Sequence, residues 1–353
     1  ALFSIERDAR MAGYGINDAK LVGCKILMRS TSVTLPSNII ANSPGTGNGA
    51  FAPALILGTT AQPVLRLAYA GGRSIAPTTL TQAHGGTSSE IMRVINLYGL
   101  KEAGTMILLT QENAASTLTP KAGSPCTILQ TSKDFLSDTD RDLQTNSSGL
   151  SPFSPPSGSA QPYALGADVF NIGALTVIDS NLPANSPVWR EYIIDPATET
   201  LQEKNLFVSS SHTVVSNNIT NMYVDYMMRD GTTRTGLSNG STAPELSGVL
   251  STGTPAAKDA QIAEMRNVIG LRVSLLVRQP APDYSKGSEC KNPADESAET
   301  LITNQNSDSL STGFRDNAGN DIRFALTRTY NSNAFCYRYK AQSTTVMMRN
   351  LLW

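Results

Sequence analysis

The chain has 353 residues, a formal net charge of −1 and 16% charged residues, below the roughly 25% of an average soluble domain. This near-neutral balance, without a long run of Lys or Arg, argues against nucleic acid and anionic membrane surfaces as partners. No stretch approaches the ~18 consecutive apolar residues of a membrane span, and the length suffices for one large domain or two.

The first predicted element is a helix over residues 1–12. Leu2, Ile5, Ala9 and Ala12 recur at steps of three and four residues, so they share one face that we expect to pack on an antiparallel sheet. Gly13 then ends the helix, because glycine adopts the left-handed conformation at little cost. No side chain before Leu2 can cap the first turn, so the sequence indicates the end of a helix whose beginning is missing.

The opposite side of this helix carries Phe3, Arg7 and Arg10, with Glu6 beside them. Glu6 precedes Arg10 by four residues, the favourable order for a surface ion pair. Phe3 is a large apolar group to leave in water. We therefore predict that Phe3, Arg7 and Arg10 contact a partner; the alternative is that Phe3 packs on a loop of its own chain.

After the helix, the hydrophobic period changes from about 3.6 to 2, which is typical of strands. The clearest alternation covers 269–277, and residues 222–228 show the same pattern before a turn at Asp230-Gly231. One further helix is predicted at 254–267. Shorter strand-like runs are found at 64–70, 90–99, 105–111, 126–132, 189–195, 322–330 and 335–350.

A polar, proline-rich segment at 143–162 separates two groups of strand-like runs. A domain linker is one reading of it. We interpret it instead as a surface insertion within one domain, because strand-like runs continue on both sides.

Four cysteines lie far apart in the sequence and form no C-x-x-C pair. Zinc is excluded because His84 and His212, the two histidines, are badly spaced from them. Two disulfides in an oxidising compartment are expected, with free buried thiols in a cytosolic protein as the alternative. Of the three possible pairings we predict Cys24–Cys126 and Cys290–Cys336.

No catalytic or cofactor pattern is convincing. Residues 236–240, GLSNG, match a nucleophile elbow by letter, but Ser238 lies in a loop and no histidine follows it. The GTGNG stretch at 45–49 lacks the spacing of a phosphate-binding loop. We predict no enzymatic activity and no cofactor.

Asp138, Asp140 and Asp142 imitate the start of a calcium-binding loop. The glycine and the glutamate that such a loop requires at its sixth and twelfth positions are missing. A calcium site of another kind stays open beside the simpler reading of a solvated acidic turn. The DNAGND segment at 316–321 is expected to make a hairpin turn.

Four blocks of the sequence resemble type IV pilus minor pilins of the PilW type. They are RDARMAGYG at the start, VSNNITNMYVDYMMRDG at 215–231, RNVIGLRVSLLVRQP at 266–280 and YKAQSTTVMMRNLLW at the end. The first and last blocks are the most specific, and the polar segments between the blocks match little.

This resemblance implies an α+β, mostly β, pilin-like fold in which an N-terminal helix packs on an antiparallel β-sheet with long loops. Residues 1–14 would be the C-terminal half of the pilin helix and residues 15–353 the β-rich globular head. The missing first half of the helix would span the inner membrane, so that this chain is expected to be a soluble truncation with a periplasmic head.

The implied function is that of a structural subunit that helps to start assembly of a type IV pilus and sits near the tip of the extracellular fibre. Its partners would be other minor pilins and the major pilin, met through the N-terminal helix, and a tip adhesin. A minor pseudopilin of type II secretion is an alternative within the same superfamily. A secreted adhesin or carbohydrate-binding head is the alternative from another class.

Overall fold

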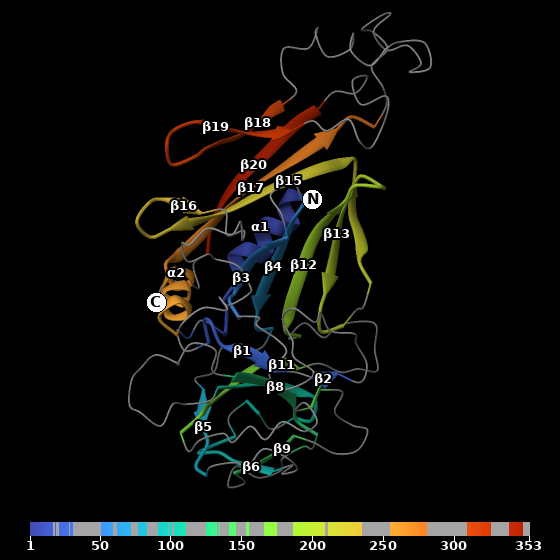
Figure 1. The fold of residues 1–353 in the computed structure, drawn as a ribbon. Helices are drawn as coiled ribbons and strands as arrows, with labels where there is room; N and C mark the ends of the chain where they lie inside the picture. The colour runs from blue at the N-terminus through green and yellow to red at the C-terminus, as the bar shows by residue number, and fades with distance from the viewer. Residues whose placement is uncertain are drawn as a thin grey trace, which may run out of the picture.

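Figure 1 shows a computed structural model of the chain. The structure describes residues 1–16, 18, 21–27, 29–30, 51–58, 62–71, 77–82, 91–97, 99–100, 102–110, 125–132, 134, 141–145, 153–154, 166–174, 186–208, 211–234, 255–280, 309–325 and 339–348. Within these residues the chain forms two helices, and its strands group into six sheets.

The strongest sequence signals form one antiparallel sheet of order β16-β15-β17-β20. Its strands are β15 (Ile219–Met228), β16 (Thr233–Arg234), β17 (Val268–Arg278) and β20 (Tyr339–Met347). Helix α2 (Pro255–Arg266) leads directly into β17. The predicted strands at 222–228 and 269–277, the turn at Asp230-Gly231 and the helix at 254–267 are thereby confirmed.

A second antiparallel sheet has the order β14-β13-β12-β4-β3. Its strands are β3 (Ala54–Gly58), β4 (Pro63–Tyr69), β12 (Val188–Asp195), β13 (Thr200–Asn205) and β14 (Thr213–Asn217). In β4 and β12, Ala68 lies opposite Trp189, Leu67 opposite Arg190, and Arg66 opposite Glu191. Because opposite residues share a face, this register decides which polar groups meet.

The third large sheet has the order β1-β8-β7-β11-β5 and includes a parallel pair, β1 with β8. Its strands are β1 (Lys25–Leu27), β5 (Thr78–Thr79), β7 (Thr105–Thr110), β8 (Pro125–Gln130) and β11 (Asp168–Ala174). Every residue of β7 is buried, since alternate residues serve two separate hydrophobic clusters on the two faces. A sheet covered on both faces explains the continuous apolar run of this strand.

Three two-stranded sheets complete the fold: β2 (Arg29–Ser30) with β10 (Phe153–Ser154), β6 (Ile91–Arg93) with β9 (Asp142–Gln144), and β18 (Ser309–Arg315) with β19 (Asp321–Ala325). The β18–β19 connection is a tight turn in which the Asp316 carboxylate accepts from two backbone N–H groups. The hairpin predicted from DNAGND is confirmed. In the predicted insertion at 143–162, residues 143–144 belong to β9 and residues 153–154 are β10.

Helix α1 (Leu2–Met11) lies between two of the sheets (Figure 1). It contacts β17 and β20 of the first sheet and β4 of the second. The Gly13 N–H donates to Ala68 O of β4 at 2.9 Å, so the chain leaves the helix already attached to the sheet. None of the helices in the described part of the chain is both long and apolar enough to cross a membrane.

The expected pilin-like fold, one N-terminal helix packed on an antiparallel sheet, is wrong. The chain is mostly β, as expected, but its strands divide among several separate sheets and one of these contains a parallel pair. Pairing between strands distant in sequence, such as β4 with β12, produces this division, and hydrophobic periodicity contains no information about it.

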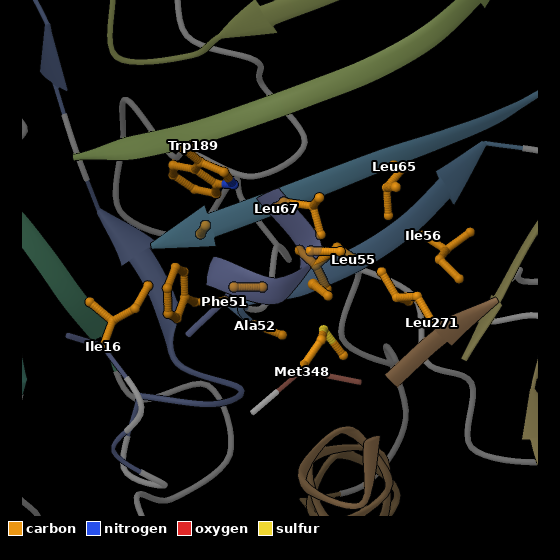
Figure 2. Packing of buried hydrophobic residues seen from close by; sticks show 14 of the residues in the cluster. Ile16, Phe51, Ala52, Leu55, Ile56, Leu65, Leu67, Trp189, Leu271 and Met348 are labelled. Atoms are coloured by element: carbon orange, nitrogen blue, oxygen red, sulfur yellow. The ribbon is translucent and has the colours of Figure 1, made fainter. Parts of the chain in front are cut away.

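The main hydrophobic core lies where the first two sheets meet α1 (Figure 2). Leu65 of β4, Ile56 of β3 and Leu271 of β17 are all fully buried in it. The Tyr226 hydroxyl of β15 also donates to Ala54 O at 3.3 Å and accepts from Ile56 N at 2.6 Å. This hydroxyl joins β15 to the edge strand β3 of the other sheet.

Candidate functional site

The inner face of α1 is the one that the sequence predicts. Ile5, Ala9 and Ala12 are completely buried, and Leu2 packs partly against the same core. Ala and Ile side chains allow the helix axis to approach the strands closely. The apolar face assigned from periodicity is therefore confirmed.

A buried carboxylate, Asp8, fixes this helix to the second sheet. Its side chain is 0% exposed. Asp8 Oδ2 accepts from Tyr192 Oη at 2.7 Å and from Arg190 Nη1 at 2.8 Å. Asp8 Oδ1 accepts from Tyr69 Oη at 3.1 Å and from Arg7 Nε at 3.0 Å. Four donors, three of them from the sheet, thus satisfy one buried charge.

The electrostatics of this network keep the side chains around Asp8 protonated, so that each can donate its hydrogen bond. Burial and the neighbouring charge of Asp8 raise the pKa of Tyr192 and of Tyr69 well above the ordinary value for tyrosine. Burial alone lowers the pKa of Arg190, but Asp8 and Tyr192 outweigh it and the net direction is upward. Both phenols and the guanidinium therefore remain protonated across the physiological range.

The outer face of α1 carries the residues predicted to meet a partner. Phe3 is 76% exposed, and Met11, eight residues later, is also exposed. Phe3, Arg7 and Met11 follow each other at four-residue steps, with Arg10 alongside, and we call these four residues the outer stripe. Arg10 forms the expected ion pair with Glu6.

Arg7, which is predicted to contact a partner, also makes a contact within the chain. Its side chain is about half exposed, and its Nε donates to Asp8. The charge of Arg7 is thereby used within the chain, and the ion pair with Glu6 balances Arg10. Phe3 is left as the dominant feature of the outer stripe.

Sequence reasoning missed Asp8, although a signal was present. Asp8 is three residues after Ile5 and four before Ala12, so it lies on the apolar face of the helix. A charged residue at a core position is buried only when it is paired. That rule alone would have marked Asp8 as an anchor.

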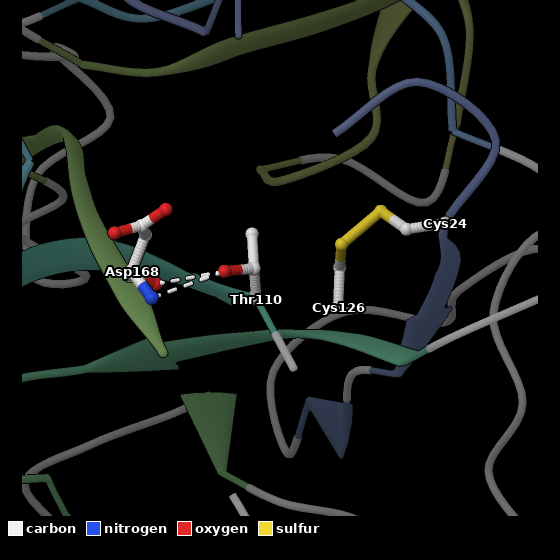
Figure 3. Close-up of a disulfide and its surroundings, with 4 residues drawn as sticks. All are labelled: Cys24, Thr110, Cys126 and Asp168. Carbon is white, nitrogen blue, oxygen red and sulfur yellow. Dashed lines mark hydrogen bonds between the residues drawn. A yellow bond between two sulfur atoms is a disulfide. The ribbon is translucent and has the colours of Figure 1, made fainter. Parts of the chain in front are cut away.

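The Cys24–Cys126 disulfide is confirmed, with the two Cα atoms 5.7 Å apart. It connects the segment after α1 to β8 (Figure 3). Thr110, directly opposite Cys126 on β7, donates from its hydroxyl to Asp168 O and accepts from Asp168 N. Cys290 and Cys336 lie outside the described residues, so their pairing stays a prediction.

The calcium hypothesis gains no support from the part of the chain that is described. Asp142 lies on β9, where Arg93 Nε and Nη2 donate to its two carboxylate oxygens at 2.6 and 2.9 Å. Asp138 and Asp140 lie outside the described residues. No group of three metal-ligating side chains occurs among the residues that are described.

Of the other singled-out residues, His212 is described: its Nε2 lies 3.0 Å from Glu191 Oε1, just before the edge strand β14. Ser238, His84 and the 45–49 stretch lie outside the described residues.

Comparison with protein-family models, with curated proteins and with solved structures gives no match for this chain.

Proposed function

We propose that this chain is a structural subunit of a type IV pilus, a minor pilin that joins its neighbours through the outer stripe of α1. Two observations support the proposal, and neither is the fold class. The first is the set of four sequence blocks that resemble PilW-type minor pilins. The second is the exposure of Phe3 on a helix whose opposite face is fixed by Asp8.

The exposure of Phe3 is the observation that carries most weight. Burying a phenylalanine that is now in water contributes about 1.5–3 kcal/mol to an association. Because three donors from the second sheet fix the pose of α1, ordering this helix adds little further entropic cost when a partner binds. Arg10 is paired with Glu6, and Arg7 shares the Asp8 carboxylate with Arg190.

In this role the subunit acts first at the inner membrane, with its body in the periplasm, and then near the tip of the extracellular fibre. Other minor pilins and the major pilin contact α1. The role is structural and needs no catalytic group or cofactor.

The test is Phe3→Ser in the full-length protein. We expect reduced co-purification with the other minor pilins and fewer surface pili, because the apolar contact is lost. The melting temperature should not change, since Phe3 contributes little to the core. Arg7→Glu is a poor choice because it places a second negative charge beside Asp8.

Val214→Ser on β14 is the matched control, because it also removes an exposed apolar side chain (56% exposed) from a different surface. It should leave piliation unchanged. Normal piliation and normal co-purification of Phe3→Ser would refute the proposal. Normal piliation together with a defect in protein secretion would move the assignment to the type II secretion alternative.

A further inference from the structure

The second sheet has another polar cluster on the face opposite to the Asp8 network. Arg66 and Glu191 lie opposite each other on β4 and β12, and Lys204 lies opposite Glu191 on β13. Arg66 Nε donates to Glu191 Oε2 at 2.5 Å. Lys204 Nζ and His212 Nε2 approach Glu191 Oε1 at 3.5 and 3.0 Å.

This cluster has more positive than negative charge. Two permanent cations, Arg66 and Lys204, share the single carboxylate of Glu191, so the net charge is +1 when His212 is neutral. Burial lowers the pKa of Arg66 more than Glu191 raises it, so the single carboxylate compensates its guanidinium incompletely. A buried excess charge of this kind calls for a counter-ion.

Two hydrogen-bond donors next to the cluster have no acceptor. Arg66 Nη1 and Trp189 Nε1 are buried, and within the described part of the chain neither atom has a partner. The two side chains are 5% and 1% exposed. Unpaired buried donors are rare in native proteins, and an unseen water or ion is a common reason for them.

The strand register puts the two donors on one face. Glu191 is opposite Arg66 and Trp189 is opposite Ala68, which makes Arg66 and Trp189 diagonal neighbours. Such neighbours are about 7–8 Å apart at the backbone, within reach of long and aromatic side chains. Ala68, which lies opposite Trp189 and two residues after Arg66 on β4, adds only a methyl group to this face.

We propose that this face of the second sheet binds a small monovalent anion of the halide type, held by Arg66 Nη1 and Trp189 Nε1. One negative charge neutralises the cluster, and an acceptor-only ligand satisfies both donors. The burial of both side chains favours a monatomic ion over sulfate or phosphate, whose second charge Glu191 would also oppose. The site stabilises β12, whose next residues on the other face, Arg190 and Tyr192, hold Asp8.

The first test is thermal unfolding of the protein in sodium chloride and in sodium gluconate at matched ionic strength. At a fixed pH of about 8, chloride should raise the melting temperature saturably by about 1–3 °C. Trp189→Phe keeps the ring and loses the N–H, so its chloride response should fall by at least half. Arg66→Met should abolish the response, and Trp189→Phe carries the test if Arg66→Met does not fold.

Arg93→Met is the matched control, because it removes one positive charge at an exposed ion pair with Asp142. It should retain the full chloride response. A second readout uses bromide, which quenches tryptophan fluorescence. In a Trp353→Phe background, saturable quenching of the buried Trp189 is expected.

Equal melting temperatures in chloride and gluconate, with no saturable quenching, would mean that the two donors bind only water and would overturn the proposal. Stabilisation by sulfate without any by chloride would overturn the assignment to a monovalent anion.

Discussion

At the scale of single residues, Asp8 determines how α1 is held. Burying a carboxylate costs free energy that only close, well-directed donors offset, and Asp8 has four of them. Asp8 lies on the helix face opposite Phe3. One residue therefore fixes α1 to the sheet, and another is expected to contact the neighbouring subunit.

The Asp8→Asn variant tests this anchor. It removes the charge, leaves Arg190 poorly compensated and directs an amide N–H₂ toward donors. We expect the free energy of unfolding to fall by about 3 kcal/mol, measured by urea denaturation. Glu6→Gln, which breaks the surface pair with Arg10, should cost about 0.5 kcal/mol or less. Equal losses in the two variants would show that Asp8 is no special anchor.

At the scale of elements, the backbone that links α1 to β4 is as tightly constrained as the helix itself. Gly15 adopts φ +69°, and a Cβ atom there would lie 2.5 Å from Ala70 Cβ. Hydrogen bonds from Gly13 N to Ala68 O and from Ala70 N to Tyr14 O hold both sides of this contact. The backbone therefore has little freedom to relieve the clash.

We predict that Gly15→Ala lowers the free energy of unfolding by about 2–3 kcal/mol, as strain and a core clash combine. Gly231→Ala is the control. Gly231 has a similar φ of +83° but nothing within 4 Å of the added Cβ, so only the backbone cost of about 1 kcal/mol should appear. Urea denaturation of both variants measures the difference, and identical losses would contradict the close packing of α1 on β4.

The same elements show how far the sequence could be interpreted. Helices α1 and α2 and strands β15 and β17 follow from local periodicity, which each segment contains in itself. The pairing of β1 with β8, or of β4 with β12, depends on contacts between segments about a hundred residues apart, and no local pattern specifies it. For the site, periodicity predicted correctly that Phe3 faces outward. It did not predict that Arg7 donates to Asp8, because the burial of Asp8 was not recognised.

At the scale of the whole molecule, two hydrophobic clusters share one sheet. On β8, Cys126 and Ile128 face the main core, while Leu129 faces the smaller cluster. The Cys24–Cys126 disulfide therefore joins the α1 region covalently to the strand that separates the two clusters. Its two cysteines are 102 residues apart in the sequence, so the bond closes a long loop in the unfolded chain.

Removing this disulfide should loosen the unfolded chain more than the folded one. In the chain-entropy model a loop of about 100 residues is worth about 4.7 kcal/mol, so Cys24→Ala with Cys126→Ala should lower the free energy of unfolding by about that amount. The urea m-value should rise, because the unfolded ensemble becomes more expanded. The reduced wild-type protein should lose more stability than this variant, because reduction also opens the predicted Cys290–Cys336 bond. An unchanged m-value with a full loss of stability would place the effect in the packing of β8 instead, and alkylation of Cys24 or Cys126 in the unreduced protein would contradict the bond itself.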